Sequence, residues 1–227
     1  MDFLTKIISR LKKIKIILVT GKGRTYTSET IWQVLSLRFR PKKFIEKTPN
    51  LFDILSNNLF IIETDLKNSE AFEKVANLTK LSQLPILLVT HLGGLPADFI
   101  SFAGDKKEVA EIYKLAQLIP PYGSLILNFD DKTIRAIDNI TNLKSFTFGF
   151  LEGADFRASD VHTNKGTNFK INYKGKIIPV WLENLIGKEY IYSALATSCL
   201  GVALGLNFVE ISEALKNCKP YPNKTKS

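Results

Sequence analysis

The sequence is poor in the residues that build metal and redox sites. Its 227 residues include two cysteines and two histidines, against 31 lysines and arginines. Cys199 and Cys218 form no C-x-x-C pair and have no histidine beside them, so neither a zinc site nor a disulfide framework is predicted. Unpaired thiols of this kind are typical of a reducing compartment, and we expect a cytoplasmic protein.

Long hydrophobic runs are also missing. A membrane-spanning helix needs about 20 apolar residues, whereas the most apolar stretches, such as 14–19 and 85–89, have the length of strands. Residues 1–13 alternate apolar with basic side chains and precede no small-residue cleavage site, so they do not read as a signal peptide. They predict a short amphipathic helix, which could lie on an acidic membrane but more often packs on its own domain.

Positive charge is abundant, with a formal net charge of +9. Such a surface could attract nucleic acid, a membrane or a phosphorylated ligand. The lysines are spread along the chain in small pairs, and no nucleic-acid-binding motif accompanies them. Dispersed charge favours a solvated basic surface, so we expect no specific nucleic-acid partner.

Apolar strands alternate with helices along the first part of the chain. The expected strands are 15–20, 59–63, 85–90 and 124–128, and the expected helices are 27–39, 69–81, 106–118 and 131–140. Continuous apolar strands separated by helices are typical of a mainly parallel sheet that helices cover on both faces. The length suits one α/β domain, over residues 1–218, with a polar tail at 219–227.

A β-rich stretch follows this alternation. Short strands are expected at 145–150, 156–162, 167–173 and 176–181, with helices at 190–204 and 207–217 after them. Gly175 marks a turn between two of these strands and predicts a hairpin. The stretch therefore predicts a small β-rich subregion within the α/β domain.

A glycine turn joins the first strand to the first long helix. Gly21, Lys22, Gly23, Arg24 and Thr25 follow the strand directly. Backbone N–H groups in such a turn, together with the helix N-terminus, can bind phosphate. A glycine turn without a ligand is the alternative, because the strict G-x-x-x-x-G-K-[ST] pattern is not met. His91, after the third strand, could contact phosphate or serve only in packing.

Further segments fall in a fixed order along the chain. Residues 20–27 resemble the T-G-[ST]-x-G-K-[ST]-[ST]-T loop of the Mur ligases, which use ATP to add amino acids or dipeptides to a muramic acid precursor of peptidoglycan. Residues 61–63 (IIE) resemble their second strand, which ends in a magnesium-binding glutamate, and 127–131 (LNFDD) resemble their N-x-D-D segment. Later similarities lie at 147–158, 166–169 and 185–205. The match is collinear from about residue 14 to 215 and is nearest to the D-alanyl-D-alanine-adding branch.

The resemblance implies a P-loop-like, nucleotide-binding central domain with ATP and Mg²⁺ as cofactors. Residues 21–25 would cradle the phosphates, with Arg24 in a catalytic position. Thr25 and Glu63 would hold Mg²⁺, and Asp98 falls near a metal-binding histidine of the family. Glu63 could instead cap the next turn. Lys114 lies near the family's carbamylated lysine, although a surface lysine is the simpler interpretation.

Several positions differ from the family pattern. The loop is one residue short, and Arg24 stands where the family has lysine, which is not an interchangeable residue. Glu189, Tyr190 and Ser193 stand where the family has the residues that help to seat adenine. We therefore expect nucleotide binding to be weak and to distinguish little between bases.

The sequence covers only the central domain of the family pattern. Family members also have an N-terminal domain for the nucleotide-sugar and a C-terminal domain that closes on ATP. Because closure assembles such a reaction site, we expect the isolated chain to be inactive and ligation to need a separate chain that carries those domains. The alternative is a non-catalytic binding or regulatory module with the same fold.

Overall fold

The computed structural model describes residues 14–66, 69–96, 102 and 104–220. The helix expected at 1–13, the position of Asp98 and most of the tail from residue 221 on lie outside the described residues. No helix in the described part of the chain combines the length and the hydrophobicity that crossing a bilayer requires.

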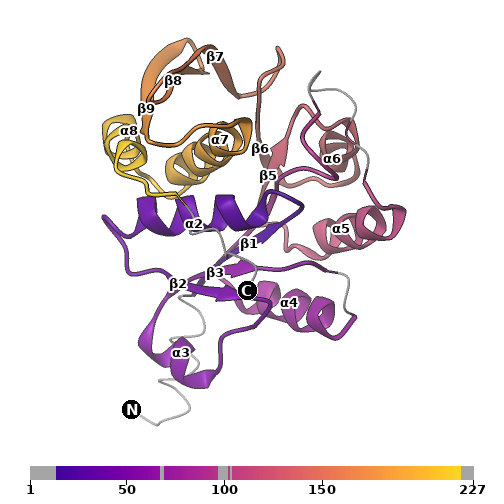
Figure 1. Cartoon of the computed structure of the whole chain (residues 1–227). Coiled ribbons are helices and arrows are strands. Elements are labelled where there is room, and N and C mark those ends of the chain that lie inside the picture. Colours follow the sequence, from indigo (N-terminus) through magenta and orange to yellow (C-terminus); the bar gives the residue numbers. More distant parts are fainter. Residues whose placement is uncertain (1–13, 67–68, 97–101, 103, 221–227) are drawn as a thin grey trace, which may run out of the picture.

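One nine-stranded sheet runs through the molecule (Figure 1). Its strands are β1 (Lys15–Thr20), β2 (Lys42–Ile45), β3 (Leu59–Glu63), β4 (Leu84–Val89), β5 (Ser124–Asn128), β6 (Lys144–Gly149), β7 (Phe156–Thr163), β8 (Gly166–Tyr173) and β9 (Lys176–Glu183). Their spatial order is β2-β3-β1-β4-β5-β6-β7-β8-β9. The pairs from β2 to β7 are parallel, and β7-β8-β9 is an antiparallel meander.

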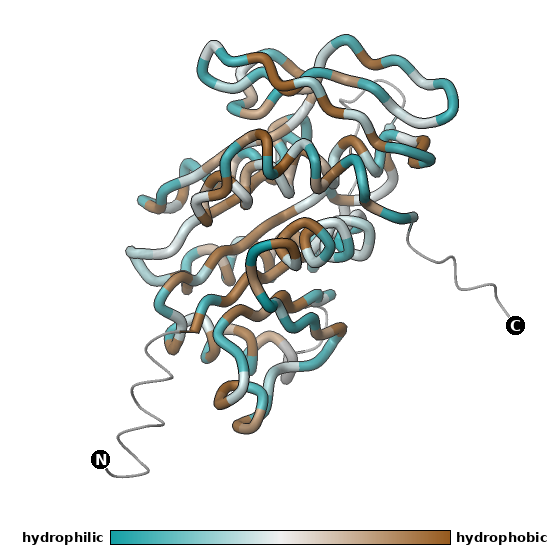
Figure 2. The backbone as a smooth tube through the Cα atoms, turned by 90° about the vertical axis from the view of Figure 1, so that its left-hand side faces the viewer, coloured by the Kyte–Doolittle hydropathy of each residue, from teal (hydrophilic) through white to brown (hydrophobic). Residues whose placement is uncertain are grey.

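Helices cover both faces of the parallel part. Figure 1 shows α2 (Arg24–Leu35), α7 (Lys188–Ala203) and α8 (Phe208–Lys216) on one side, and α4 (Ser69–Leu81) and α5 (Lys106–Leu118) on the other. A hydrophobic core lies on each face of the sheet. Successive side chains of β1 pack into one core and then the other, because strand residues point alternately to opposite faces. Ile17 and Val19 pack under α2, whereas Ile16 and Leu18 pack toward α4 and α5. In Figure 2, hydrophobic residues, coloured brown, are concentrated in the segments that run through the middle of the molecule.

The predicted α/β fold is confirmed, with differences at its margins. β2 and α3 (Leu51–Ser56) are not predicted by the sequence pattern. β2 has four residues and follows Pro41, so it shows too little periodicity. α3 depends on a capping box between Asn50 and Asp53, a signal that the sequence does contain. The helix expected at 131–140 is a single turn, α6 (Lys132–Arg135), followed by the 3₁₀ helix Ala136–Ile140.

One further difference affects the site. α2 begins at Arg24 rather than at residue 27, which places Arg24 and Thr25 in the first turn of the helix. The predicted β-rich subregion is confirmed as the meander β7-β8-β9. β7 pairs with β6 through Phe156 and Arg157, so the subregion is continuous with the parallel part of the sheet.

Candidate phosphate-loop site

The glycine turn between β1 and α2 packs tightly against the end of β4. Gly21 has φ +96°, a conformation that residues with side chains rarely adopt. A Cβ atom on Gly21 would lie 2.5 Å from Thr90 Oγ1, and one on Gly23 would lie 2.9 Å from His91 Nε2. Both positions therefore require glycine, because the backbone of the turn touches its neighbours directly.

Two N–H groups of the turn already have partners. The Lys22 N–H donates to the carbonyl oxygen of His91 at 2.8 Å, and the Gly23 N–H donates to Thr90 Oγ1 at 3.1 Å. The first-turn N–H groups of α2 follow, and Gly23, as the residue before the helix, has no side chain to cap them. A phosphate would meet the helix N-terminus most readily, because binding deeper in the turn would displace existing hydrogen bonds.

Glu63 lies at the end of β3, beside the first turn of α2, with 4% of its side chain exposed. Thr25 Oγ1 donates to its Oε1 atom at 2.5 Å, and Ser28 Oγ donates to its Oε2 atom at 2.8 Å. The structure thus brings together the two residues, Thr25 and Glu63, that the resemblance assigns to Mg²⁺. It adds Ser28, which the sequence did not single out.

Arg24 turns toward carboxylates rather than toward open solvent. Its Nη2 lies 3.3 Å from Asp65 Oδ2, and its Nε lies 3.7 Å from Glu46 Oε1 and 3.8 Å from Glu63 Oε1. Its Nη1 also donates to the Gly21 carbonyl at 3.1 Å. The side chain is 21% exposed, so these contacts hold it close to the protein.

Glu46 and Asp65 were not expected at this site. Glu46 follows β2, which the sequence pattern did not predict, and it adopts a positive φ of 51°. The Asp65 N–H donates to Glu46 Oε2 at 3.2 Å, which links the two acids. Asp65 lies two residues after Glu63, and this spacing at a strand end was the available signal.

The arrangement does not fit Mg²⁺ as it stands. Mg²⁺ needs oxygen ligands at about 2.0–2.1 Å in octahedral geometry. Both oxygens of Glu63 accept hydrogen bonds from the protein, and the guanidinium of Arg24 lies against the same carboxylate. Among the described residues, no three acidic, histidine or cysteine side chains gather as a metal-binding group. The metal roles assigned to Thr25 and Glu63 stay predictions from the resemblance.

His91 packs against the glycine turn. It is 6% exposed, and its Nδ1 atom lies 2.9 Å from the Gly93 carbonyl. Burial lowers the pKa of His91 below its ordinary value, although the Gly93 carbonyl and the charge of Asp131 oppose the shift. The packing interpretation of His91 is therefore the one that these contacts support.

The N-x-D-D segment positions the end of β5. The N–H groups of Phe150 and Leu151 donate to the Asp130 carboxylate at 2.8 and 3.0 Å, and the Tyr192 hydroxyl donates to it at 2.7 Å. Asp131 caps α6 and accepts the Leu92 N–H at 3.0 Å. Both carboxylates are buried and serve as acceptors that join loops at the carboxyl ends of the strands.

The positions that differ from the family's adenine residues lie against α2. Ser193 Oγ and Thr27 Oγ1 are 3.1 Å apart and share a hydrogen bond. The Tyr190 ring packs edge-on against the Tyr26 ring, with centroids 5.3 Å apart. The start of α7 therefore lies next to the first turns of α2, on the loop side.

Lys114 lies on α5, apart from these contacts. Its side chain is 65% exposed, with Nζ 3.5 Å from Glu111 Oε1 and 5.8 Å from the centroid of the Phe72 ring. These partners belong to α5 and α4, on the opposite face of the sheet from α2. The contacts support the surface interpretation, and a catalytic role for Lys114 stays a prediction without structural support.

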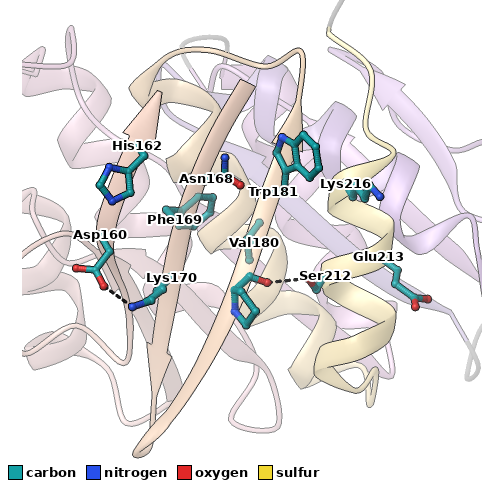
Figure 3. Close-up of a pocket in the computed structure, with 11 residues that line it drawn as sticks. Asp160, His162, Asn168, Phe169, Lys170, Val180, Trp181, Ser212, Glu213 and Lys216 are labelled. Atoms are coloured by element: carbon teal, nitrogen blue, oxygen red, sulfur yellow. Dashed lines mark hydrogen bonds and ion pairs between the residues drawn. The ribbon is translucent and has the colours of Figure 1, made fainter. Parts of the chain in front are cut away.

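A concavity lies over the exposed side of the meander and one edge of α8 (Figure 3). Its volume is about 400 Å³, and Trp181, His162 and Lys170 contribute to its lining. Three of its charged side chains, those of Asp160, Lys170 and Lys216, contact neighbouring side chains. Lys170 pairs with Asp160 at 2.7 Å, and Lys216 lies 5.5 Å from the centroid of the Trp181 ring. None of the described residues assigned to phosphate or metal lines it.

The chain matches known proteins along most of its length. The Mur ligase middle domain model matches residues 19–201. The UDP-N-acetylmuramate--L-alanine ligase of Persephonella marina is 26% identical over 210 residues, which are 91% of this chain and 43% of that protein. The ligase of the same name from Geotalea uraniireducens is 31% identical over 150 residues, which are 65% of this chain and 32% of that protein.

Solved structures share the fold. The UDP-N-acetylmuramoylalanyl-D-glutamyl-2,6-diaminopimelate--D-alanyl-D-alanyl ligase from Acinetobacter baumannii superposes with a TM-score of 0.73 at 19% identity, covering 95% of this chain and 48% of that one. A pseudomurein peptide ligase type C from Methanothermus fervidus gives a TM-score of 0.67 at 18% identity, covering 96% and 52%. The chain thus spans about half, or less, of the length of these proteins.

Proposed function

Because the chain belongs to the Mur ligase middle-domain family, we propose that it is a nucleotide-binding domain of the ligase lineage, which takes polyphosphate at the N-terminus of α2. The observation that carries the proposal is the glycine turn, whose backbone approaches β4 so closely that only glycine fits at Gly21 and Gly23. The uncapped first turn of α2 then offers N–H donors and positive potential to an anion.

We expect this binding to be weak. Lys22 and Gly23 already donate their N–H groups within the protein. A dissociation constant of roughly 0.1–1 mM corresponds to about 4–5.5 kcal/mol of binding free energy. Phosphate contacts would supply most of it, so ATP, GTP and tripolyphosphate should bind with similar affinity.

A chemical-shift titration with these three ligands tests the proposal. The signals of residues 21–27 should move, and Thr25→Ala should weaken binding because it removes a hydroxyl beside the helix N-terminus. Thr30→Ala is the matched control. It removes a hydroxyl from the same helix, where Thr30 Oγ1 donates to the Tyr26 carbonyl, and it should leave the affinity unchanged. The proposal fails if no ligand moves residues 21–27 at about 5 mM, far above the expected constant.

A non-catalytic module is the second candidate. It is favoured by the internal pairing of the turn and by the engagement of Arg24 with acidic side chains. Failure of all three ligands to bind would support it.

The substrate branch and the setting belong to this proposal as well. The curated relatives are named as L-alanine ligases, whereas the D-alanyl-D-alanyl ligase matches at 19% identity, which supports the fold alone. We propose a muramic acid–amino acid ligase lineage, in which the D-alanyl-D-alanine branch stays a prediction. Ligation by way of a separate chain and a cytoplasmic setting are also predictions. Both described cysteines are free, as a reducing compartment would allow.

A further inference from the structure

We infer that the guanidinium of Arg24 is the resident cation of this site and keeps divalent metal ions away from Glu63. The inference concerns the cation alone, so its test does not depend on whether the turn binds nucleotides.

The charge of Arg24 lies among acidic side chains. Three carboxylates, those of Glu46, Glu63 and Asp65, surround the Arg24 guanidinium, with N···O distances of 3.3 to 3.8 Å. A metal ion bound to Glu63 would lie beside this fixed positive charge. Like charges repel strongly at such distances in a partly buried site, so the guanidinium disfavours a metal ion there.

The spacing of the acids suits a guanidinium. A planar guanidinium presents several N–H donors in a fixed fork and can contact more than one carboxylate at once. The acids are spaced around this fork, and none of the described acidic groups gathers as a metal-binding set. The Nε atom of Arg24 is buried without a hydrogen-bond partner in the described structure, and the nearest acids lie 3.7 and 3.8 Å away. The contact of Nε with these two acids is therefore ionic, without a hydrogen bond.

Hydrogen bonds within the protein fix the acids in place. The Glu46 N–H donates to the Glu63 carbonyl at 2.9 Å, and Glu46 in turn accepts the Asp65 N–H. The hydroxyls of Thr25 and Ser28 hold the two oxygens of Glu63. This network keeps the carboxylates turned toward Arg24 without any bound metal.

The experiment uses Mn²⁺ alone as the probe, because it binds oxygen ligands and broadens the NMR signals of nearby residues. The wild-type chain should show no saturable broadening at Thr25, Ser28 and Glu63. Arg24→Ala should show saturable broadening there, with a dissociation constant at least about tenfold below the highest Mn²⁺ concentration that leaves the wild type unsaturated. Arg24→Ala/Glu63→Gln should lose this binding. Arg38→Ala is the matched control, because Arg38 pairs with Glu210 away from this site, and it should behave as wild type.

The wild-type chain itself keeps the inference falsifiable if Arg24→Ala does not fold. Saturable broadening at Thr25 and Ser28 that disappears in Glu63→Gln would show a metal ion on Glu63 beside the arginine, and would overturn the inference. A folded Arg24→Ala that binds Mn²⁺ no better than Arg38→Ala would overturn it as well.

Discussion

Individual residues of the site have roles that depend on their burial. His91 is nearly inaccessible and lies under the glycine turn, so its protonated form is costly in the folded state. The Thr90 hydroxyl accepts a hydrogen bond from the Gly23 N–H, and the His91 carbonyl accepts one from the Lys22 N–H. Both residues thus hold the turn in place, and His91 also makes it sensitive to acid.

His91 should make the folded state sensitive to acid. Its pKa is lowered by burial, so the unfolded chain takes up a proton first, as pH falls below the ordinary histidine value of about 6.5. The folded state then loses stability relative to the unfolded state, by at most about 1.4 kcal/mol per pH unit for this group. Urea unfolding between pH 7.5 and 5.5 should show a steeper loss for wild type than for His91→Gln.

His162→Gln is the control for this measurement, because His162 lies exposed on β7. His162→Gln should lose stability with falling pH as steeply as wild type. Because all three proteins share the same carboxylates, the contribution of these groups cancels in the comparison. Equal slopes for wild type and His91→Gln would contradict the burial argument.

At the scale of elements, α7 and the loop after β6 are joined through one buried carboxylate. Asp130 accepts the Tyr192 hydroxyl from α7 and two N–H groups from the loop that follows β6. Burial and the neighbouring Asp130 charge raise the pKa of Tyr192, so its hydroxyl stays protonated and can donate. This bond aligns the helix whose start lies beside α2.

Tyr192→Phe should therefore destabilise the fold by about 1–3 kcal/mol, because the buried carboxylate loses a donor. Chemical denaturation measures the difference. Tyr190→Phe, which removes a hydroxyl from a half-buried ring two residues earlier, should change stability by less than about 0.5 kcal/mol. Equal losses in the two variants would show that the Asp130 bond contributes nothing specific.

The element boundaries show how far a sequence pattern reaches. β1, β3, β5, α4 and α5 have the predicted bounds, because long apolar runs and amphipathic periods are local signals. β2 was not predicted, since its four residues, Lys42–Ile45, are an edge strand that is only half-buried. The shift of the α2 start to Arg24 depends on the contacts of the turn with β4, which no local pattern contains.

For the whole molecule, the net charge of +9 comes from basic residues that are spread along the chain. Many basic side chains pair with acidic neighbours, as Lys43 does with Glu29 and Arg38 with Glu210. We expect only weak, sequence-independent binding in a gel-shift titration at about 150 mM salt. Submicromolar binding that depends on base sequence would contradict this prediction.

The sequence by itself determined the α/β class, the order of most strands and helices, and the family, because hydrophobic periodicity and collinear motifs are written along the chain. The resemblance also placed Thr25 and Glu63 at one site, and in the structure the two side chains share a hydrogen bond. Only the tertiary structure decided what surrounds Arg24. Glu46 and Asp65 reach it from the ends of β2 and β3, and the direction of a long, flexible cation is set by the charges that the fold assembles around it.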